Sequence, residues 1–451
     1  MIKKLITAIL LCLCATLLFS CGEKEENSEI KSVESLPMPS YKSGETVTIN
    51  VYNWGEYISD GSEGSIDTNA EFEKYFNEYL SEKYGGIKIK VEYSTYPTNE
   101  DLYSKLKNSA VAYDIVIPSD YMIQRLKDEG MLYSFNASDL SNYSNISEQF
   151  KNAYYDPNNE FSVPYTYGMM GIIYNRETVD PEDVKNKSWE LLWNTKYAGN
   201  ILQFNNPRDA FATAMYWKGL DINSTDRAVW DEALKLLEEQ KPILQGYVND
   251  EIFNKMQTES AAIAPYFVGD FLTMAEEEEN LAFYYPTEGV NYFVDAMCIP
   301  SCSKNPQLAK EYINFMLSEE IAIANATYIG YATPNEAAKN SAEYKAIMDE
   351  YSYEGENGET AYDLLYGYDP DTVNAKYNSL FSDDVISPAC YRTFDADTQS
   401  YINTLWENLK ISGSTELWVH IASIAIVVLV VGFSSYSIYV KKKRSRHYRK
   451  P

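Results

Sequence analysis

The segment TVTINVYNWGEYI, residues 46–58, constrains the fold of this chain more than any other. Apolar and polar residues alternate over Val47–Val51, the period-two pattern of a half-buried strand. The strand runs directly into Trp54, Gly55 and Glu56. In open α/β sheets ligands bind at the carboxyl ends of strands, and an aromatic face beside a carboxylate suits an organic cation. The pattern therefore predicts a binding edge; the alternative is a core tryptophan and a surface glutamate.

Two further predicted strands, residues 87–93 and 113–118, also end in polar or aromatic side chains. Ser94 and Tyr96 follow the first of them, and Ser119 follows the second. Because the carboxyl ends of parallel strands meet at one edge of a sheet, we expect these side chains to converge on the same binding edge.

A second α/β lobe is predicted after an extended crossing at residues 161–165. There Asn206 has the pattern of a helix N-cap followed by proline, so Asp209 serves either capping or ligand binding. The chain then crosses back into an apolar strand at residues 292–297, which contains Asp295. An unpaired buried carboxylate costs several kcal/mol, so Asp295 should have a partner, either a structural Arg or Lys or a bound cation.

Both ends of the chain predict export and membrane attachment. Residues 1–21 have a basic start and an apolar run and end like a bacterial lipobox, which makes Cys21 the expected lipidation site. Residues 22–44 are polar and show no periodicity, which predicts a flexible tether. Residues 417–440 carry no charge and are long enough to span a bilayer, and the basic tail 441–451 places that end in the cytoplasm.

Composition excludes several functions for the exported part. The signal and the tail hold nine of the 38 Lys and Arg but none of the 66 Asp and Glu, so the remainder has a formal charge near −37, which disfavours nucleic acid. The two histidines, His420 and His447, lie outside it, which excludes Ser-His-Asp and Cys-His catalysis and most zinc sites. Its cysteines, Cys298, Cys302 and Cys390, lack metal-site spacing, and a disulfide among them is left open. We expect no cofactor and no metal.

Several motifs occur in order across residues 47–340: YNWGEY, YSTYPTNEDLYSKLK, YDIVIPSDY, VPYTYG, YPTEGVNYFVDAM and IGYATPNEAA. Together they resemble the spermidine/putrescine-binding proteins of polyamine ABC importers. The resemblance implies an α/β, two-lobed periplasmic-binding-protein-like fold (type II) with a hinged cleft, over residues 45–410. It implies one lobe at about 45–166 and 287–330, and the other at about 167–286 and 331–410.

The strand-end pattern and the resemblance together give one predicted ligand set. It comprises Trp54, Glu56, Tyr57, Ser94, Tyr96, Ser119, Asn206, Asp209, Phe267, Phe293, Asp295 and Tyr331. Relative to the family pattern, Gly55 replaces a hydroxyl residue and Asn206 replaces an aspartate. A late glutamine of the family has no clear counterpart in 380–400, and the C-terminal span is unusual for it.

The two ends of the chain imply a lipoprotein on the extracytoplasmic face of the cell membrane, and the resemblance implies its task. Such a protein captures spermidine or putrescine and delivers it to an ABC permease, without catalysis. Three cleft acids (Glu56, Asp209 and Asp295) favour spermidine slightly over putrescine. The alternatives are a sensory ectodomain, a binder of another small cation, a tyrosine-rich ferric binder and a carboxylate-pair enzyme.

Overall fold

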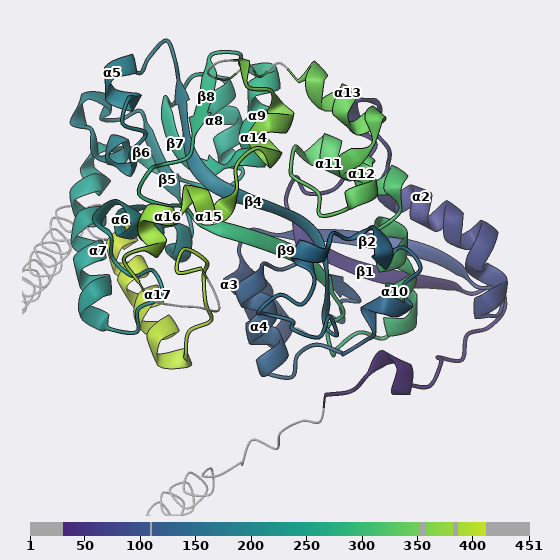
Figure 1. The fold of residues 1–451 in the computed structure, drawn as a ribbon. Helices are drawn as coiled ribbons and strands as arrows, with labels where there is room; N and C mark the ends of the chain where they lie inside the picture. Colours follow the sequence, from purple (N-terminus) through teal and green to yellow (C-terminus); the bar gives the residue numbers. More distant parts are fainter. Residues whose placement is uncertain are drawn as a thin grey trace, which may run out of the picture.

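The computed structural model describes residues 30–411 apart from 109–110, 352, 354, 356–357 and 382–386. Two α/β lobes lie side by side, and two long strands, β4 (Ser162–Asn175) and β9 (Tyr292–Cys298), run between them (Figure 1). The predicted signal 1–21, residues 22–29 of the predicted tether, the predicted span 417–440 and the tail 441–451 lie outside the described residues. The prediction of a flexible tether is wrong for the part that is described, because Val33 is 1% exposed and its N–H donates to the Ser134 carbonyl at 2.8 Å, which fixes this segment on the first lobe.

The strands form one path in the order β2-β1-β3-β9-β4-β7-β5-β6, with β8 paired to β4. In the first lobe β1 pairs in parallel with β2 and β3, and in the second β5 pairs in parallel with β6 and β7. The remaining bounds are β1 (Thr46–Trp54), β2 (Lys88–Tyr96), β3 (Ile115–Val116), β5 (Ile201–Phe204), β6 (Leu244–Val248), β7 (Ile263–Phe267) and β8 (Leu281–Tyr284). The predicted strand at the start of the domain is therefore confirmed, with its carboxyl end at Trp54.

Strand β4 belongs to both lobes because its two halves pair with different strands. Its first half pairs antiparallel with β9, and its second half pairs antiparallel with β7 and β8. The register shifts between Pro164 and Thr166, where proline lacks the backbone N–H that a regular ladder needs. After this shift Thr166 lies opposite Asp295. The predicted crossings near residues 161–165 and 292–297 are confirmed.

Helices cover the sheet of each lobe (Figure 1). Those near β1 and β2 are α2 (Thr68–Tyr75), α3 (Asn99–Asn108), α4 (Asp120–Asp128), α10 (Pro306–Met316) and α11 (Glu319–Ile329). Those of the second lobe are α5 (Pro181–Val184), α6 (Pro207–Lys218), α7 (Arg227–Gln240), α8 (Glu251–Gln257) and α9 (Val268–Glu277). The later helices are α12 (Glu336–Asn340), α13 (Ala342–Glu350), α14 (Ala361–Tyr366), α15 (Pro370–Val373), α16 (Ala375–Asn378) and α17 (Ala396–Ile411).

The last part of the chain contacts both lobes. Helix α12 and helix α13 pack against α11, whereas α14 packs on α9 and α17 packs on α7. The lobe boundaries expected from the sequence remain a prediction. Within the described part of the chain, Cys298, Cys302 and Cys390 are free thiols, so no disulfide joins them. None of the helices described there is long and apolar enough to span a bilayer.

Candidate functional site

A cavity of about 110 Å³ lies where the carboxyl ends of β1, β2 and β3 face those of β5, β6 and β7. Each set of parallel strands brings its carboxyl ends to one edge, and the β4–β9 crossing turns the two edges toward each other. The two lobes lie close together beside the cavity. A Cβ atom added to Gly55 of the first lobe would lie 2.4 Å from the Asp250 Oδ2 of the second.

Ten of the twelve predicted ligand residues line this cavity. They are Trp54, Tyr57, Tyr96, Ser119, Asn206, Asp209, Phe267, Phe293, Asp295 and Tyr331. The residues come from both lobes and from β9, so only the folded chain brings them together. Glu56 and Ser94 do not line the cavity.

Glu56 lies outside the cavity because the chain turns sharply after β1. Its φ of 46° is in the left-handed region, and its exposed side chain lines a separate, larger hollow of about 920 Å³. Asp250 and Asp270 line both spaces, so the hollow adjoins the cavity. Ser94 is exposed on β2, and its hydroxyl donates to the Val51 carbonyl at 3.4 Å.

Asp295 occupies the centre of β9 and is 4% exposed. Its Oδ2 accepts a hydrogen bond from the Tyr57 hydroxyl at 2.7 Å, and its Oδ1 has no hydrogen-bond partner among the described residues. Burial raises the pKa of Asp295 to about 7, although the hydroxyls of Ser119 and Tyr57 partly oppose that shift. Within the described residues no Lys or Arg forms an ion pair with Asp295. The alternative that a structural Lys or Arg neutralises this carboxylate is therefore wrong for the described part of the chain. One oxygen of the carboxylate is left for a ligand.

Asp209 lies in the first turn of α6, where the expected cap is confirmed. The Asn206 Oδ1 accepts from the Asp209 backbone N–H at 2.9 Å, and the Asn206 Nδ2 donates to the Asp209 Oδ2 at 2.8 Å. The Tyr391 hydroxyl donates to the Asp209 Oδ1 at 2.8 Å. Burial raises the pKa of Asp209 despite these hydrogen bonds. Asn206 thus both caps the helix and holds the carboxylate in place.

Four more acids line the cavity that sequence analysis did not assign to it: Glu100, Asp120, Asp250 and Asp270. Burial raises the pKa of Asp120 to about 8 and the pKa of Asp270 to about 7. Asp120, Asp250 and Asp270 all closely follow the carboxyl ends of strands, which is the signal that could have found them. The cavity therefore has six carboxyl groups, twice the number of acids expected.

Arg208 is the one cationic residue among the described cavity-lining residues. It is 3% exposed, and its guanidinium lies 5.2 Å from the Tyr121 ring centre, 4.5 Å from that of Tyr391 and 4.3 Å from that of Phe394. Its Nη1 donates to the Arg392 carbonyl at 3.3 Å. One fixed cation against six acids leaves a large excess of carboxyl groups. Tyr391, like Arg208, was missed because it belongs to no recognisable local motif.

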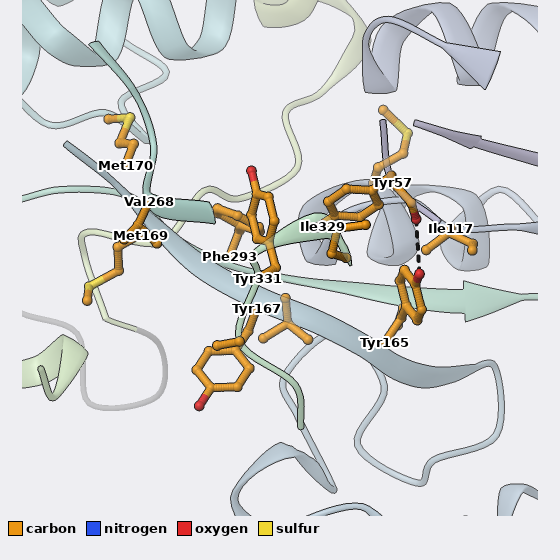
Figure 2. Packing of buried hydrophobic residues seen from close by; sticks show 14 of the residues in the cluster. Tyr57, Ile117, Tyr165, Tyr167, Met169, Met170, Val268, Phe293, Ile329 and Tyr331 are labelled. Carbon is orange, nitrogen blue, oxygen red and sulfur yellow. Dashed lines mark hydrogen bonds between the residues drawn. The ribbon is translucent and has the colours of Figure 1, made fainter. Parts of the chain in front are cut away.

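Aromatic rings form the rest of the wall. Trp54 is half-buried, lies 4.7 Å from Tyr96 between ring centres, and donates from Nε1 to the Ile117 carbonyl at 2.9 Å. Tyr57 and Tyr331 lie 5.1 Å apart in an edge-to-face contact, near Phe293, beside the β4–β9 crossing (Figure 2). The Tyr331 hydroxyl donates to the Asp270 Oδ2 at 2.6 Å. Rings and carboxylates together suit an elongated organic cation with apolar carbon between its charges.

A metal site does not fit the same acids. Within the part of the chain that the structure describes, no group of three or more His, Cys, Asp or Glu residues is arranged to hold a metal ion. Three of the carboxylates that line the cavity already accept hydrogen bonds from tyrosine hydroxyls: Asp209, Asp270 and Asp295.

Comparison with known proteins agrees with this geometry. The family described as bacterial extracellular solute-binding protein matches residues 71–349. The chain is 31% identical over 320 residues to the spermidine/putrescine-binding periplasmic protein of Escherichia coli K12, covering 71% of this chain and 86% of that protein.

Solved structures give the same result. A putative spermidine/putrescine ABC transporter protein from Listeria monocytogenes is 30% identical with a TM-score of 0.66, covering 81% of this chain and 99% of its own. The spermidine/putrescine ABC transporter substrate-binding protein PotD from Streptococcus pneumoniae is 32% identical with a TM-score of 0.58, covering 81% of this chain and 98% of its own.

The raised pKa of Asp295 makes a prediction for the stability of the ligand-free protein. Because the folded state holds this proton more tightly than the unfolded state, stability should fall as pH rises from about 4 through about 7. A shift from 3.8 to about 7 corresponds to at most about 4 kcal/mol for this group. We expect Asp295→Asn to remove this pH-dependent loss, so that the stability of the variant relative to the unmodified chain rises between pH 5 and pH 8.

Urea unfolding of ligand-free protein at the two pH values measures this difference. The exposed Asp349, exchanged to Asn, serves as the control and should change neither value. An equal destabilisation of Asp295→Asn at pH 5 and pH 8 would mean that the carboxylate serves structure and does not carry a burial cost.

Proposed function

Because the chain belongs to the family of bacterial extracellular solute-binding proteins, we propose that it captures a polyamine between its lobes and delivers it to an ABC permease. The observation that carries the proposal is the composition of the cavity wall: six carboxyl groups and one arginine among aromatic rings. A polyamine has several ammonium groups separated by methylene chains, which need acids and apolar faces in alternation. Family relatives are named for spermidine and putrescine.

The mechanism we propose is binding without chemistry. Ammonium groups pair with Asp295 and with the second-lobe acid Asp209, while Trp54, Phe293 and Tyr331 cover the methylene carbons. Closure of the lobes removes water, which strengthens each charge pair. Because the matched family is one of solute-binding proteins, we propose a transport receptor and not an enzyme.

We propose that several carboxyl groups of the cavity are protonated in the ligand-free protein. These protons neutralise the negative charge that ligand ammonium groups neutralise in the complex. Burial raises the pKa of Asp120, Asp270 and Asp295 to between about 7 and about 8, so a substantial fraction of these groups is protonated at neutral pH. A bound ammonium group favours the ionised form of each acid beside it. Polyamine binding should therefore release protons.

The ten predicted residues that line the cavity are proposed as ligand contacts. We propose that the Glu56 carboxylate attracts a cation to the adjoining hollow, outside the cavity. Ser94 remains a prediction with no support from its exposed position on β2.

Attachment to the extracytoplasmic face of the membrane is part of the proposal. It rests on the signal ending in Cys21 and on the uncharged segment 417–440 with its basic flank. We expect Cys21→Ala to abolish lipid labelling while the protein stays in the membrane fraction. Recovery of this variant in the soluble fraction would show that segment 417–440 does not hold the chain in the membrane.

Calorimetry on the full-length chain tests the binding proposal. We expect spermidine and putrescine to bind, with proton release seen as a dependence of the heat on the ionisation enthalpy of the buffer. Asp295→Asn should weaken binding by about 2–5 kcal/mol, as for truncation of one partner of a buried charge pair. Asp349→Asn, on the exposed surface, should bind like the unmodified chain. Binding of sugars or ferric iron with no response to polyamines would refute the proposal.

A further inference from the structure

Asn291 is a cavity residue that the resemblance did not suggest. It lies directly before β9, is 4% exposed and lines the cavity. Its Oδ1 is buried and has no hydrogen-bond partner among the described residues. A buried acceptor left without a donor is costly, so an unsatisfied amide oxygen in the wall of a ligand cavity points to a donor that arrives with the ligand.

The strand geometry aims Asn291 into the cleft. The Met170 N–H donates to the Asn291 carbonyl at 3.3 Å, which continues the antiparallel ladder one step beyond the Met169–Tyr292 pair. Side chains on a strand alternate between faces, so residues 291, 293 and 295 share one face and Tyr292 has the other. All three residues on that face line the cavity, and Tyr292 does not.

Two buried side-chain oxygens on this face of β9 have no hydrogen-bond donor among the described residues. Among the cavity-lining residues described, the buried side-chain oxygens without a hydrogen-bond partner are Asp295 Oδ1 and Asn291 Oδ1. The residues are four apart on an extended strand, so they are separated by about 13 Å at a rise of about 3.3 Å per residue. Both acceptors are on one wall, so for a ligand that lies flat along this wall the hydrogen bonds run across its axis and add little to its reach.

The spacing selects for ligand length. In a zigzag of bonds of about 1.5 Å, the five bonds between the nitrogens of a butane-diamine span roughly 6 Å, about half the separation. The nine bonds between the terminal nitrogens of a linear triamine span roughly 11 Å, close to the separation. A diamine held at Asp295 therefore does not reach Asn291, whereas a triamine does.

We propose that Asn291 determines ligand length, by accepting a hydrogen bond from the far amino group of a linear triamine whose near end is paired with Asp295. The inference rests on the proposed function and names the residue that separates triamines from diamines. Asn291 supplies an uncharged acceptor, whereas Asp295 at the other end of the ligand supplies charge. The opposing arrangement is a structural water held by Asn291 and by the Arg208 Nη2, which also has no partner among the described residues.

Calorimetry on the full-length chain, with spermidine and putrescine as probes, tests this proposal. We expect Asn291→Leu to weaken spermidine binding by about 10- to 100-fold, the range for a hydrogen bond to a charged group, and to leave putrescine affinity nearly unchanged. Asn291→Asp should strengthen spermidine binding more than putrescine binding. Tyr292→Phe, which removes a hydroxyl from the opposite face of the same strand, should affect neither ligand.

The outcomes separate the two proposals. If the unmodified chain binds both polyamines and Asn291→Leu changes both affinities equally or neither, Asn291 does not set ligand length. If Asn291→Leu lowers the urea midpoint of the ligand-free protein and Asn291→Ser keeps full selectivity, the residue is structural and the inference is wrong. If the unmodified chain binds neither polyamine, the proposed function itself fails, and the assignment of Asn291 fails with it.

Discussion

The antiparallel ladder between β4 and β9 is the interaction on which the rest of this structure depends. Among the described residues it joins the sheets of the two lobes, since β4 pairs with β9 in its first half and with β7 and β8 in its second. The register shift at Pro164 places Thr166 opposite Asp295, and the Tyr57 hydroxyl contacts both side chains, at 2.5 Å and 2.7 Å. A slip of one residue would turn Asp295 into the opposite layer and remove the charge from the cleft.

The same ladder explains why so many acids can be buried together. Each set of parallel strands brings acids to its own carboxyl edge, and the ladder holds the two edges face to face. Six carboxyl groups then line one small cavity, and Arg208 is the one cationic residue among its described lining residues. Burial raises the pKa of several of them toward neutral, so protons stabilise the empty cleft. Under the proposed function, a polycation replaces those protons, and ligand capture is then coupled to proton release.

Local sequence patterns predicted the parts of the site that depend on neighbours in the chain. The strand ending at Trp54, the Asn206 cap before Asp209 and the acid inside β9 were all readable, because alternation and capping act over a few residues. Asp250 and Asp270 follow strand ends and so carry a local signal, but that they share one cavity with the first-lobe acids depends on which strands pair across the whole domain. The position of Glu56 outside the cavity follows from a left-handed backbone turn at a residue that is not glycine, which no local pattern signals.

Asn291 is another residue of the site that local sequence patterns could not predict. Its sequence context, between a glycine turn and an apolar strand, has no feature of a ligand residue, and only the strand register aims it into the cleft. A crystal structure of the full-length chain with spermidine is the sharpest test of the proposed binding mode, in which the ligand lies along β9. This binding mode predicts ligand density along β9, with one amino group at the Asp295 Oδ1 and the far one at the Asn291 Oδ1, between the faces of Trp54 and Phe293. Density confined to the hollow beside Glu56, or an empty cleft at saturating spermidine, would contradict it.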